Sequence, residues 1–396
     1  MNQPLYSRRD FIRIGVGAAV AAPRGLTRTA ETVPVPAAAR AANAKVAISA
    51  CREYGPSVRA ALAKNFDLLG GVGGLVKNKT VTVKVNLTGT DFKPVFGRPV
   101  GEIYMTHPAT VMALTGLLFK AGARRVRFVE SSNSRQSFAD VLTAAGWDVK
   151  ALEALGKVEW EDTRNVGLGK DYATFRVPGG GHLFSKFDLN HSYHDTDVFV
   201  SLCKLKLHVT TGVTLTMKNL FGITPNALYG DEAPGENATK GRGRLHDLTG
   251  WRARENPLPF DPPGTTDRFL DSRDPGHRVP RIIADLCAAR PVHLGIIDGI
   301  TAMSGGEGPW TKRVMRVTTP GLIIVGFDPV ATDTIGTAVM GYDKPRAPRG
   351  VAPFLSCDNH LLLAEQVGAG TADLARIEVV GMPLANARSN QYPVPL

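Results

Sequence analysis

The order of apolar and polar residues along the chain switches repeatedly between a period of two and a helical period. In KTVTVKVNL, residues 79–87, valines alternate strictly with polar residues, so Lys84 and Asn86 fall on the face opposite the valines. Strict alternation predicts a strand with two chemically different faces. Further strands are predicted at residues 45–50, 124–131, 196–206, 291–300 and 321–329.

Between these predicted strands lie segments whose apolar residues recur three and four positions apart. The clearest is RVPRIIADLCAAR, residues 278–290, where Val279, Ile283 and Leu286 share one helical face. Strands that alternate with helices indicate an α/β domain, so we predict a mainly parallel sheet with helices on both faces. Other helices are expected at residues 55–71, 106–123, 137–147, 212–222 and 330–341.

Two stretches interrupt this alternation. Residues 156–190 predict an excursion with one or two antiparallel strands. Residues 223–276 are rich in Gly, Pro, Arg, Asp and Asn and predict an irregular, lid-like insertion. Because there is no internal repeat and no linker after residue 44, residues 45–396 are expected to form one elaborated α/β domain.

The first 44 residues resemble an export signal. SRRDFIR, from Ser7 to Arg13, precedes the apolar run IGVGAAVAA, and a small-residue site, ANA, ends at Ala44. Paired arginines followed by Asp-Phe-Ile-Arg resemble a twin-arginine signal, so residues 1–44 are predicted to be a signal peptide. The protein is then expected to be periplasmic or otherwise exported, with the twin-arginine export machinery as a partner.

The net charge favours anionic partners but does not indicate nucleic acid. Of the formal +11, the predicted signal holds +4 (six Arg against Asp10 and Glu31), which leaves +7 for the remainder. The basic residues are scattered and form no recognition-helix, RNP or zinc-finger pattern, so no nucleic-acid partner is expected. No apolar run approaches the ~20 residues of a membrane span, so none is expected in the mature chain.

The four cysteines are widely spaced and include no C-x-x-C pair. Their spacing supports neither a zinc ribbon nor an iron–sulfur cluster. A disulfide is compatible with an exported protein. Cys203 and Cys287, however, lie in apolar segments typical of buried free thiols, so both alternatives stay open at this stage.

Charged and polar residues collect where the predicted strands end. Ligands of open α/β sheets bind at the carboxyl ends of the strands, so these residues are expected to meet at one edge. Lys204, Lys206 and His208 stand out because their strand is apolar and a buried lysine without partners is costly. The other candidates are Lys84, Asn86, His107, Glu130, Lys218, Asn219, Asp298, Glu307 and Asp333, with Asp328 at the end of the strand at 321–329.

These candidates divide into a cationic and an acidic set with three predicted roles. One role is catalysis, by His208, Lys206 and Glu130. The second is binding of an anionic substrate, by Lys84, Asn86, His107, Lys204, Lys218 and Asn219. The third is coordination of a divalent metal through the oxygens of Asp298, Glu307 and Asp333. The alternative is a purely structural ion network, in which the aspartates cap helices or form turns.

Several blocks of the sequence resemble the domain-of-unknown-function family 362. They include VKVNLT, THPATVMALTGLLFKAGARRVRFVES, DVFVSLCKLKLHVTTGVTLTMKNLFG, IIDGITAMSGGEGP and GFDPVATDT, and they run from about residue 45 to about 381. The K-x-K-x-H block with the following M-K-N is the most specific of them. Some members of that family resemble or adjoin ferredoxin-like modules, but this chain lacks the cysteines for one.

Together these patterns favour an exported enzyme that acts on a small anionic substrate, a carboxylate or a phosphate. Whether a divalent metal takes part, and which reaction is catalysed, are left open by the sequence. Two other functions are compatible with the same residues. The first is a non-catalytic periplasmic ligand-binding or carrier protein, and the second is a structural or maturation partner.

Overall fold

A computed structural model describes residues 28–29, 44–89, 92–248, 261–311 and 314–392. The predicted signal peptide lies outside the described residues except for Arg28–Thr29 and Ala44. Arg28–Thr29 form a two-residue strand, β1, which pairs in parallel with β6 (Ala173–Arg176). In the described part, no helix is both long and apolar enough to cross a membrane.

An eight-stranded sheet forms the centre of the molecule and confirms the predicted α/β class. Five of its seven strand pairings are parallel, as predicted for a mainly parallel sheet. In spatial order the strands are β15 (Ile377–Gly381), β2 (Ala44–Ala50), β14 (Leu322–Gly326), β11 (Leu294–Gly299), β8 (Val198–Lys204), β3 (Thr80–Lys84), β4 (Arg125–Glu130) and β5 (Val158–Asp162).

Strand β14 runs antiparallel to both of its neighbours, β2 and β11. The hairpin of β12 (Ala302–Ser304) and β13 (Arg316–Thr318) connects β11 to β14. The chain therefore enters β14 at the edge where β11 ends, and β14 finishes at the opposite edge. The expectation that Asp328 joins the other strand ends is thus wrong.

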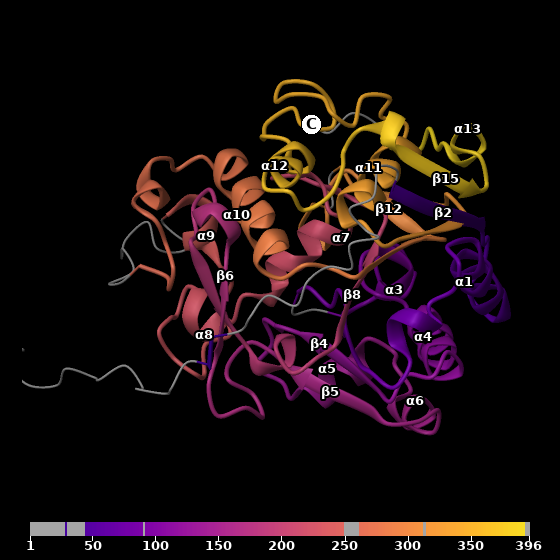
Figure 1. The fold of residues 1–396 in the computed structure, drawn as a ribbon, viewed down its shortest axis with the longest axis horizontal. Helices are drawn as coiled ribbons and strands as arrows, with labels where there is room; N and C mark the ends of the chain where they lie inside the picture. Colours follow the sequence, from indigo (N-terminus) through magenta and orange to yellow (C-terminus); the bar gives the residue numbers. More distant parts are fainter. Residues whose placement is uncertain (1–27, 30–43, 90–91, 249–260, 312–313, 393–396) are drawn as a thin grey trace, which may run out of the picture.

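Helices cover both faces of the sheet, as predicted (Figure 1). Each face has its own apolar core. Val198 and Val200 of β8 pack into one core, and Phe199 between them packs into the other, because successive strand side chains point to opposite faces. One core includes α1 (Pro56–Leu68), α4 (Pro108–Lys120) and α5 (Phe138–Ala144). The other includes α7 (Leu215–Lys218), α10 (Pro275–Ala289), α11 (Pro329–Val339) and α12 (His360–Gln366).

The irregular stretches contain short elements. Strand β5 joins the main sheet, while β6 pairs antiparallel with β7 (Lys186–Leu189), which confirms antiparallel strands in this excursion. The described part of the 223–276 insertion contains α8 (Asn226–Tyr229) and α9 (Gly243–Asp247). Besides several 3-10 helices, the remaining short elements of the described residues are α2 (Gly73–Val76), α3 (Val100–Ile103), α6 (Val149–Glu153), β9 (Leu207–His208), β10 (Gly212–Val213) and α13 (Leu384–Ala387).

Candidate functional site

A cavity of about 300 Å³ lies at the carboxyl edge of β3, β4 and β8. The chain segments that follow these strands form its walls, together with α7 and part of the 223–276 insertion. The structure brings eight of the predicted site residues to this cavity. They are Lys84, Asn86, Glu130, Lys206, His208, Lys218, Asn219 and Glu307.

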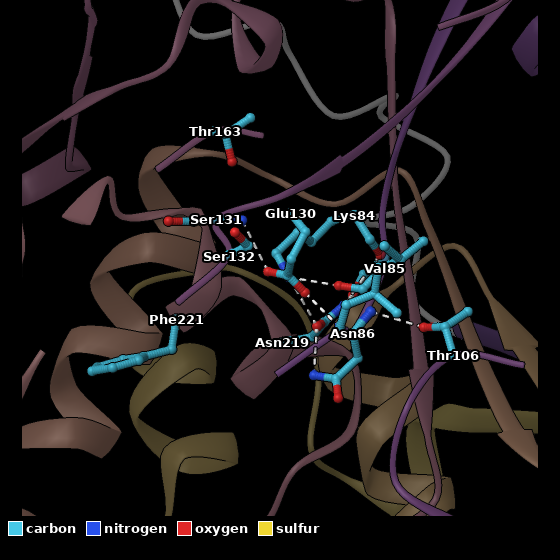
Figure 2. A network of polar contacts seen from close by, with 12 residues as sticks. Lys84, Val85, Asn86, Thr106, Glu130, Ser131, Ser132, Thr163, Asn219 and Phe221 are labelled. Atoms are coloured by element: carbon cyan, nitrogen blue, oxygen red, sulfur yellow. Dashed lines mark hydrogen bonds and ion pairs between the residues drawn. The ribbon is translucent and has the colours of Figure 1, made fainter. Parts of the chain in front are cut away.

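Lys84 and Glu130 form a buried ion pair on one side of the cavity, where β3 and β4 end (Figure 2). The Lys84 ammonium lies 2.6 Å from Glu130 Oε1 and also donates to the Val85 carbonyl at 2.6 Å. Glu130 accepts two further hydrogen bonds, from the backbone N–H of Leu87 at 2.7 Å and of Ser131 at 3.0 Å. Burial lowers the pKa of Lys84, and the Glu130 carboxylate opposes that shift.

Asn86 and Asn219 lie beside this ion pair (Figure 2), and Asn219 connects it to the neighbouring strand β8. Asn219 Oδ1 accepts from Lys84 Nζ at 3.3 Å and from Asn86 Nδ2 at 3.2 Å. The Asn219 amide nitrogen donates to Ser201 Oγ at 3.1 Å and to the Leu202 carbonyl at 3.3 Å. Because these bonds use the polar atoms of Asn219, its role here is to hold the cavity wall together.

Lys206 is buried and uses all three of its ammonium protons. It donates to Asn86 Oδ1 at 3.1 Å, to the Tyr104 carbonyl at 2.8 Å and to the Glu307 carbonyl at 3.0 Å. Burial lowers the pKa of Lys206 to about 7, whereas three acceptors at these distances fit the protonated form. This geometry makes Lys206 a fixed positive charge that ties three chain segments together.

His208 is a neutral imidazole in the cavity wall. Burial and then the charge of Lys218 lower the His208 pKa well below its usual value. Its Nδ1 accepts the backbone N–H of Thr210 at 3.0 Å, so the ring proton resides on Nε2. A neutral imidazole of this tautomer can donate a hydrogen bond to an oxygen atom of a ligand.

Lys218 has a different environment from the other lysines, because its ammonium lies over the Phe221 ring, 4.6 Å from the centroid. Within the described residues, the Lys218 ammonium has no hydrogen-bond acceptor and no carboxylate at ion-pair distance. The side chain is partly exposed and lines the cavity. Burial lowers the pKa of Lys218 to about 8, with Glu307 opposing and Arg242 assisting the shift.

The backbone that presents Lys218 is held in an uncommon conformation by Asp333. Leu215, at the start of α7, has φ of +51°, which is rare for a residue with a branched side chain. Asp333 Oδ1 accepts from Thr216 N at 2.8 Å and from Thr216 Oγ1 at 2.5 Å, and its Oδ2 accepts from Met217 N at 2.8 Å. These bonds satisfy the first N–H groups of α7 and fix its direction.

Arg242 and His246, from the 223–276 insertion, also line the cavity and were not predicted as site residues. Among the described residues, Arg242 donates only to uncharged oxygens, including the Thr224 carbonyl at 2.9 Å and Asn226 Oδ1 at 2.8 Å. Burial lowers the pKa of Arg242 to about 10 and that of His246 to about 4. The sequence predicted an irregular, lid-like insertion over residues 223–276, but no periodicity marked which of its residues would reach the cavity.

The charges around the cavity do not balance. Four cations line it, Lys84, Lys206, Lys218 and Arg242, against two carboxylates, Glu130 and Glu307. Both carboxylates are already engaged: Glu307 accepts from Val209 N at 3.0 Å and from Trp310 Nε1 at 2.6 Å. With neutral histidines, the lining has a net charge of +2, and the ammonium of Lys218 is the cation without a hydrogen-bonded partner in the described structure.

Lys204 and Asp298 form a separate buried network that does not line the cavity, and Tyr54, which donates to Asp298 Oδ1 at 3.1 Å, joins it to the half-buried His107. Asp298 Oδ2 accepts from Lys204 Nζ at 3.2 Å and from Thr110 Oγ1 at 3.0 Å. The His107 ring stacks on Tyr54 at 3.5 Å between centroids, and its Nδ1 caps α4 by accepting from Ala109 N. Burial lowers the His107 pKa to about 4. Tyr54 had no sequence signal, since it lies in a loop between β2 and α1.

The three predicted metal ligands lie in three different environments. Asp298 belongs to the Lys204 network, Asp333 caps α7, and Glu307 binds Val209 and Trp310 at the cavity. Across the described ranges, no group of three or more His, Cys, Asp or Glu residues is arranged to hold a metal ion. These three residues therefore do not fit a shared metal.

The chain belongs to the DUF362 family, a domain of unknown function, whose model matches residues 81–338 and so spans every cavity residue named above. Among curated proteins, the chain is similar to the thylakoid-associated protein sll1697 of Synechocystis sp. The two are 30% identical over 295 residues, which cover 74% of this chain and 73% of that protein.

The cysteines take no part in the cavity. Cys51, Cys203, Cys287 and Cys357 are all buried free thiols, so the free-thiol alternative holds in this structure. Burial raises the pKa of the Cys203 thiol well above its usual value, which keeps that thiol protonated and unreactive.

Proposed function

We propose that the protein is an enzyme whose cavity binds a small anionic substrate, a carboxylate or a phosphate. The observation that supports this most directly is the Lys218 ammonium, which lies in a cavity of net charge +2 without a hydrogen-bond acceptor in the described structure. Lys218 is half-buried, so water compensates its charge only in part, and a bound anion would supply the missing partner.

Arg242 and His208 complete the proposed anion site. The guanidinium of Arg242 donates to neutral oxygens and so keeps its full charge available to a ligand in the cavity. The Nε2–H of His208 is a neutral donor for a ligand oxygen that gains charge during a reaction. Lys206 and Glu130, predicted to be catalytic, then act in this proposal by positioning the cavity walls.

Proton transfer is assigned in this proposal to Lys218. Its pKa of about 8 lies close to neutral pH, where a group can both accept and release a proton. Neighbouring Arg242 favours the neutral amine, and the anionic substrate favours the ammonium. Substrate binding and product release would therefore change the protonation state of Lys218 in opposite directions.

A binding experiment with matched lysine variants tests the anion site. Inorganic phosphate and malonate are titrated by calorimetry into the wild type, Lys218→Met and Lys170→Met, where Lys170 is an exposed lysine outside the cavity. We expect Lys218→Met to weaken binding at least about tenfold, because a charged hydrogen bond contributes roughly 1.5–3 kcal/mol. Lys170→Met should match the wild type. Equal affinities in Lys218→Met and the wild type would refute the site.

A second measurement separates an enzyme from a binding or carrier protein. Small carboxylates and phosphate esters that bind are incubated with stoichiometric protein and followed by NMR. If the wild type converts one of these compounds to a product and His208→Gln does not, the protein is an enzyme. Stoichiometric binding without product would assign the cavity to a ligand-binding or carrier protein instead. If Lys218→Met and His208→Gln both lose stability and the wild type binds no anion, the cavity residues have a structural role.

Export through the twin-arginine route is also part of the proposal. It rests on the paired Arg8 and Arg9 before an apolar run, in a segment outside the described residues. Changing both to lysine is expected to retain the full-length precursor inside the cell, while Arg24→Lys should leave export intact. An unchanged distribution on cell fractionation of the double variant would contradict this route.

A further inference from the structure

Trp310 occupies an unusual place beside the cavity. It lines the cavity, yet 54% of the residue is exposed, although tryptophan is on average highly buried. Its indole N–H donates to Glu307 Oε1 at 2.6 Å, and its ring packs edge-to-face on Tyr104 at 6.2 Å between centroids. The ring is therefore fixed by its polar atom and by one neighbour, while more than half of the residue remains accessible.

The same carboxylate holds a second exposed apolar residue. Glu307 Oε2 accepts the backbone N–H of Val209 at 3.0 Å, and Val209 is 52% exposed. Glu307 itself is buried, and its carbonyl accepts from Lys206. One acidic residue thus connects two exposed apolar groups to the cationic wall of the cavity.

The chain also makes room for the indole. A Cβ atom added at Gly308 would lie 2.4 Å from the Trp310 ring, and one added at Gly89 would lie 3.7 Å from it. The ring therefore packs directly against the backbone at Gly308, in a position that a side chain there would prevent. These contacts hold the Trp310 ring in one orientation, so its exposed face is a fixed aromatic surface.

We propose that the ligand of this cavity carries a planar ring, as in an aryl carboxylate or aryl phosphate, and that Trp310 stacks against that ring. The inference rests on the proposed function, because the acidic group of the ligand would occupy the Lys218 site. An inorganic anion would leave the exposed indole of Trp310 in water. A ring attached to the anion would cover that indole, and offset stacking is favourable between aromatic rings.

The test compares two ligands that differ only in the ring. Inorganic phosphate and phenyl phosphate are titrated into the wild type, Trp310→Ala and Leu168→Ala, where Leu168 is 84% exposed and does not line the cavity. We expect the wild type to bind phenyl phosphate about tenfold more tightly than phosphate. In Trp310→Ala the ratio of the two dissociation constants should fall to about one, whereas Leu168→Ala should keep it. Benzoate and acetate provide the same comparison for a carboxylate.

Several outcomes would overturn the inference without touching the anion site. One is a wild type that binds phosphate and phenyl phosphate equally well. Another is a preference for phenyl phosphate that persists in Trp310→Ala. Cyclohexyl phosphate binding as tightly as phenyl phosphate would rule out stacking of a planar ring. If neither ligand bound the wild type, both the anion site and this inference would fail.

Discussion

The Lys84 ammonium lies 2.6 Å from the Glu130 carboxylate, and both side chains are buried at the carboxyl edge of the sheet. Removal of one member of a buried ion pair leaves an uncompensated charge and costs about 3–5 kcal/mol. We therefore expect Lys84→Met and Glu130→Gln each to lower the free energy of unfolding by about that amount. In the double variant the loss should be smaller than the sum of the two single losses.

Urea denaturation of the four proteins in this cycle measures the coupling. The exposed pair of Lys45 and Glu378, with nitrogen and oxygen 3.6 Å apart, serves as the matched control, and Lys45→Met should cost less than about 1 kcal/mol. Additive losses in the Lys84 and Glu130 variants would show that the pair does not act as a unit.

Anion binding should weaken as the pH rises through about 8. The Lys218 pKa is lowered to about 8, so the ammonium that attracts the anion is lost above this pH. Affinity for malonate, whose charge is constant in this range, should then fall by up to tenfold per pH unit. In Lys218→Arg the fall should move to a higher pH, because arginine stays protonated. A flat profile between about pH 7 and about pH 10 in the wild type would contradict the role of Lys218.

Asp333 should make stability depend on pH in the direction opposite to an ordinary ion-paired carboxylate. Burial raises its pKa to about 7, so between about pH 4 and pH 7 the folded protein holds a proton that the unfolded chain releases. Stability from this group therefore falls as the pH rises through that window, by at most about 1.4 kcal/mol per pH unit.

Urea denaturation of the wild type and Asp333→Asn at several pH values isolates this dependence. The free energy of unfolding of the wild type should exceed that of Asp333→Asn by less at pH 7 than at about pH 5. An advantage that grows with pH would mean that the Asp333 carboxylate, with its three hydrogen bonds, stays ionised throughout.

The sequence predicted the position of the site because burial of lysine in an apolar segment needs a local explanation. Lys84 ends the strand β3 and Lys206 follows the apolar strand β8, and both line the cavity; Lys218, at the end of the short helix α7, lines it as well. The alternation of KTVTVKVNL also placed Lys84 opposite the valines, where it meets Asn219. The spacing of apolar residues and the cost of burying a lysine among them depend only on nearby residues, so both could be predicted from the sequence.

Partners across the sheet could not be predicted in this way. Nothing in GLIIVGFDP shows that β14 runs antiparallel, so Asp328 was placed at the wrong edge. Asp298 and Asp333 have the residue type of metal ligands, but their oxygens bind Lys204 and α7. Arg242 reaches the cavity from a segment without periodicity. The direction of β14, the partners of the two aspartates and the position of Arg242 all depend on contacts with distant segments. The spacing of residues along the chain does not indicate those contacts.

The most direct test of the anion site is a crystal soaked in selenate, whose selenium atom gives an anomalous signal. We predict a peak in the cavity, with a selenate oxygen within about 3 Å of Lys218 Nζ, and no such peak in crystals of Lys218→Met. Crystals that bind selenate elsewhere but not in the cavity, or a cavity peak that persists in Lys218→Met, would contradict the account.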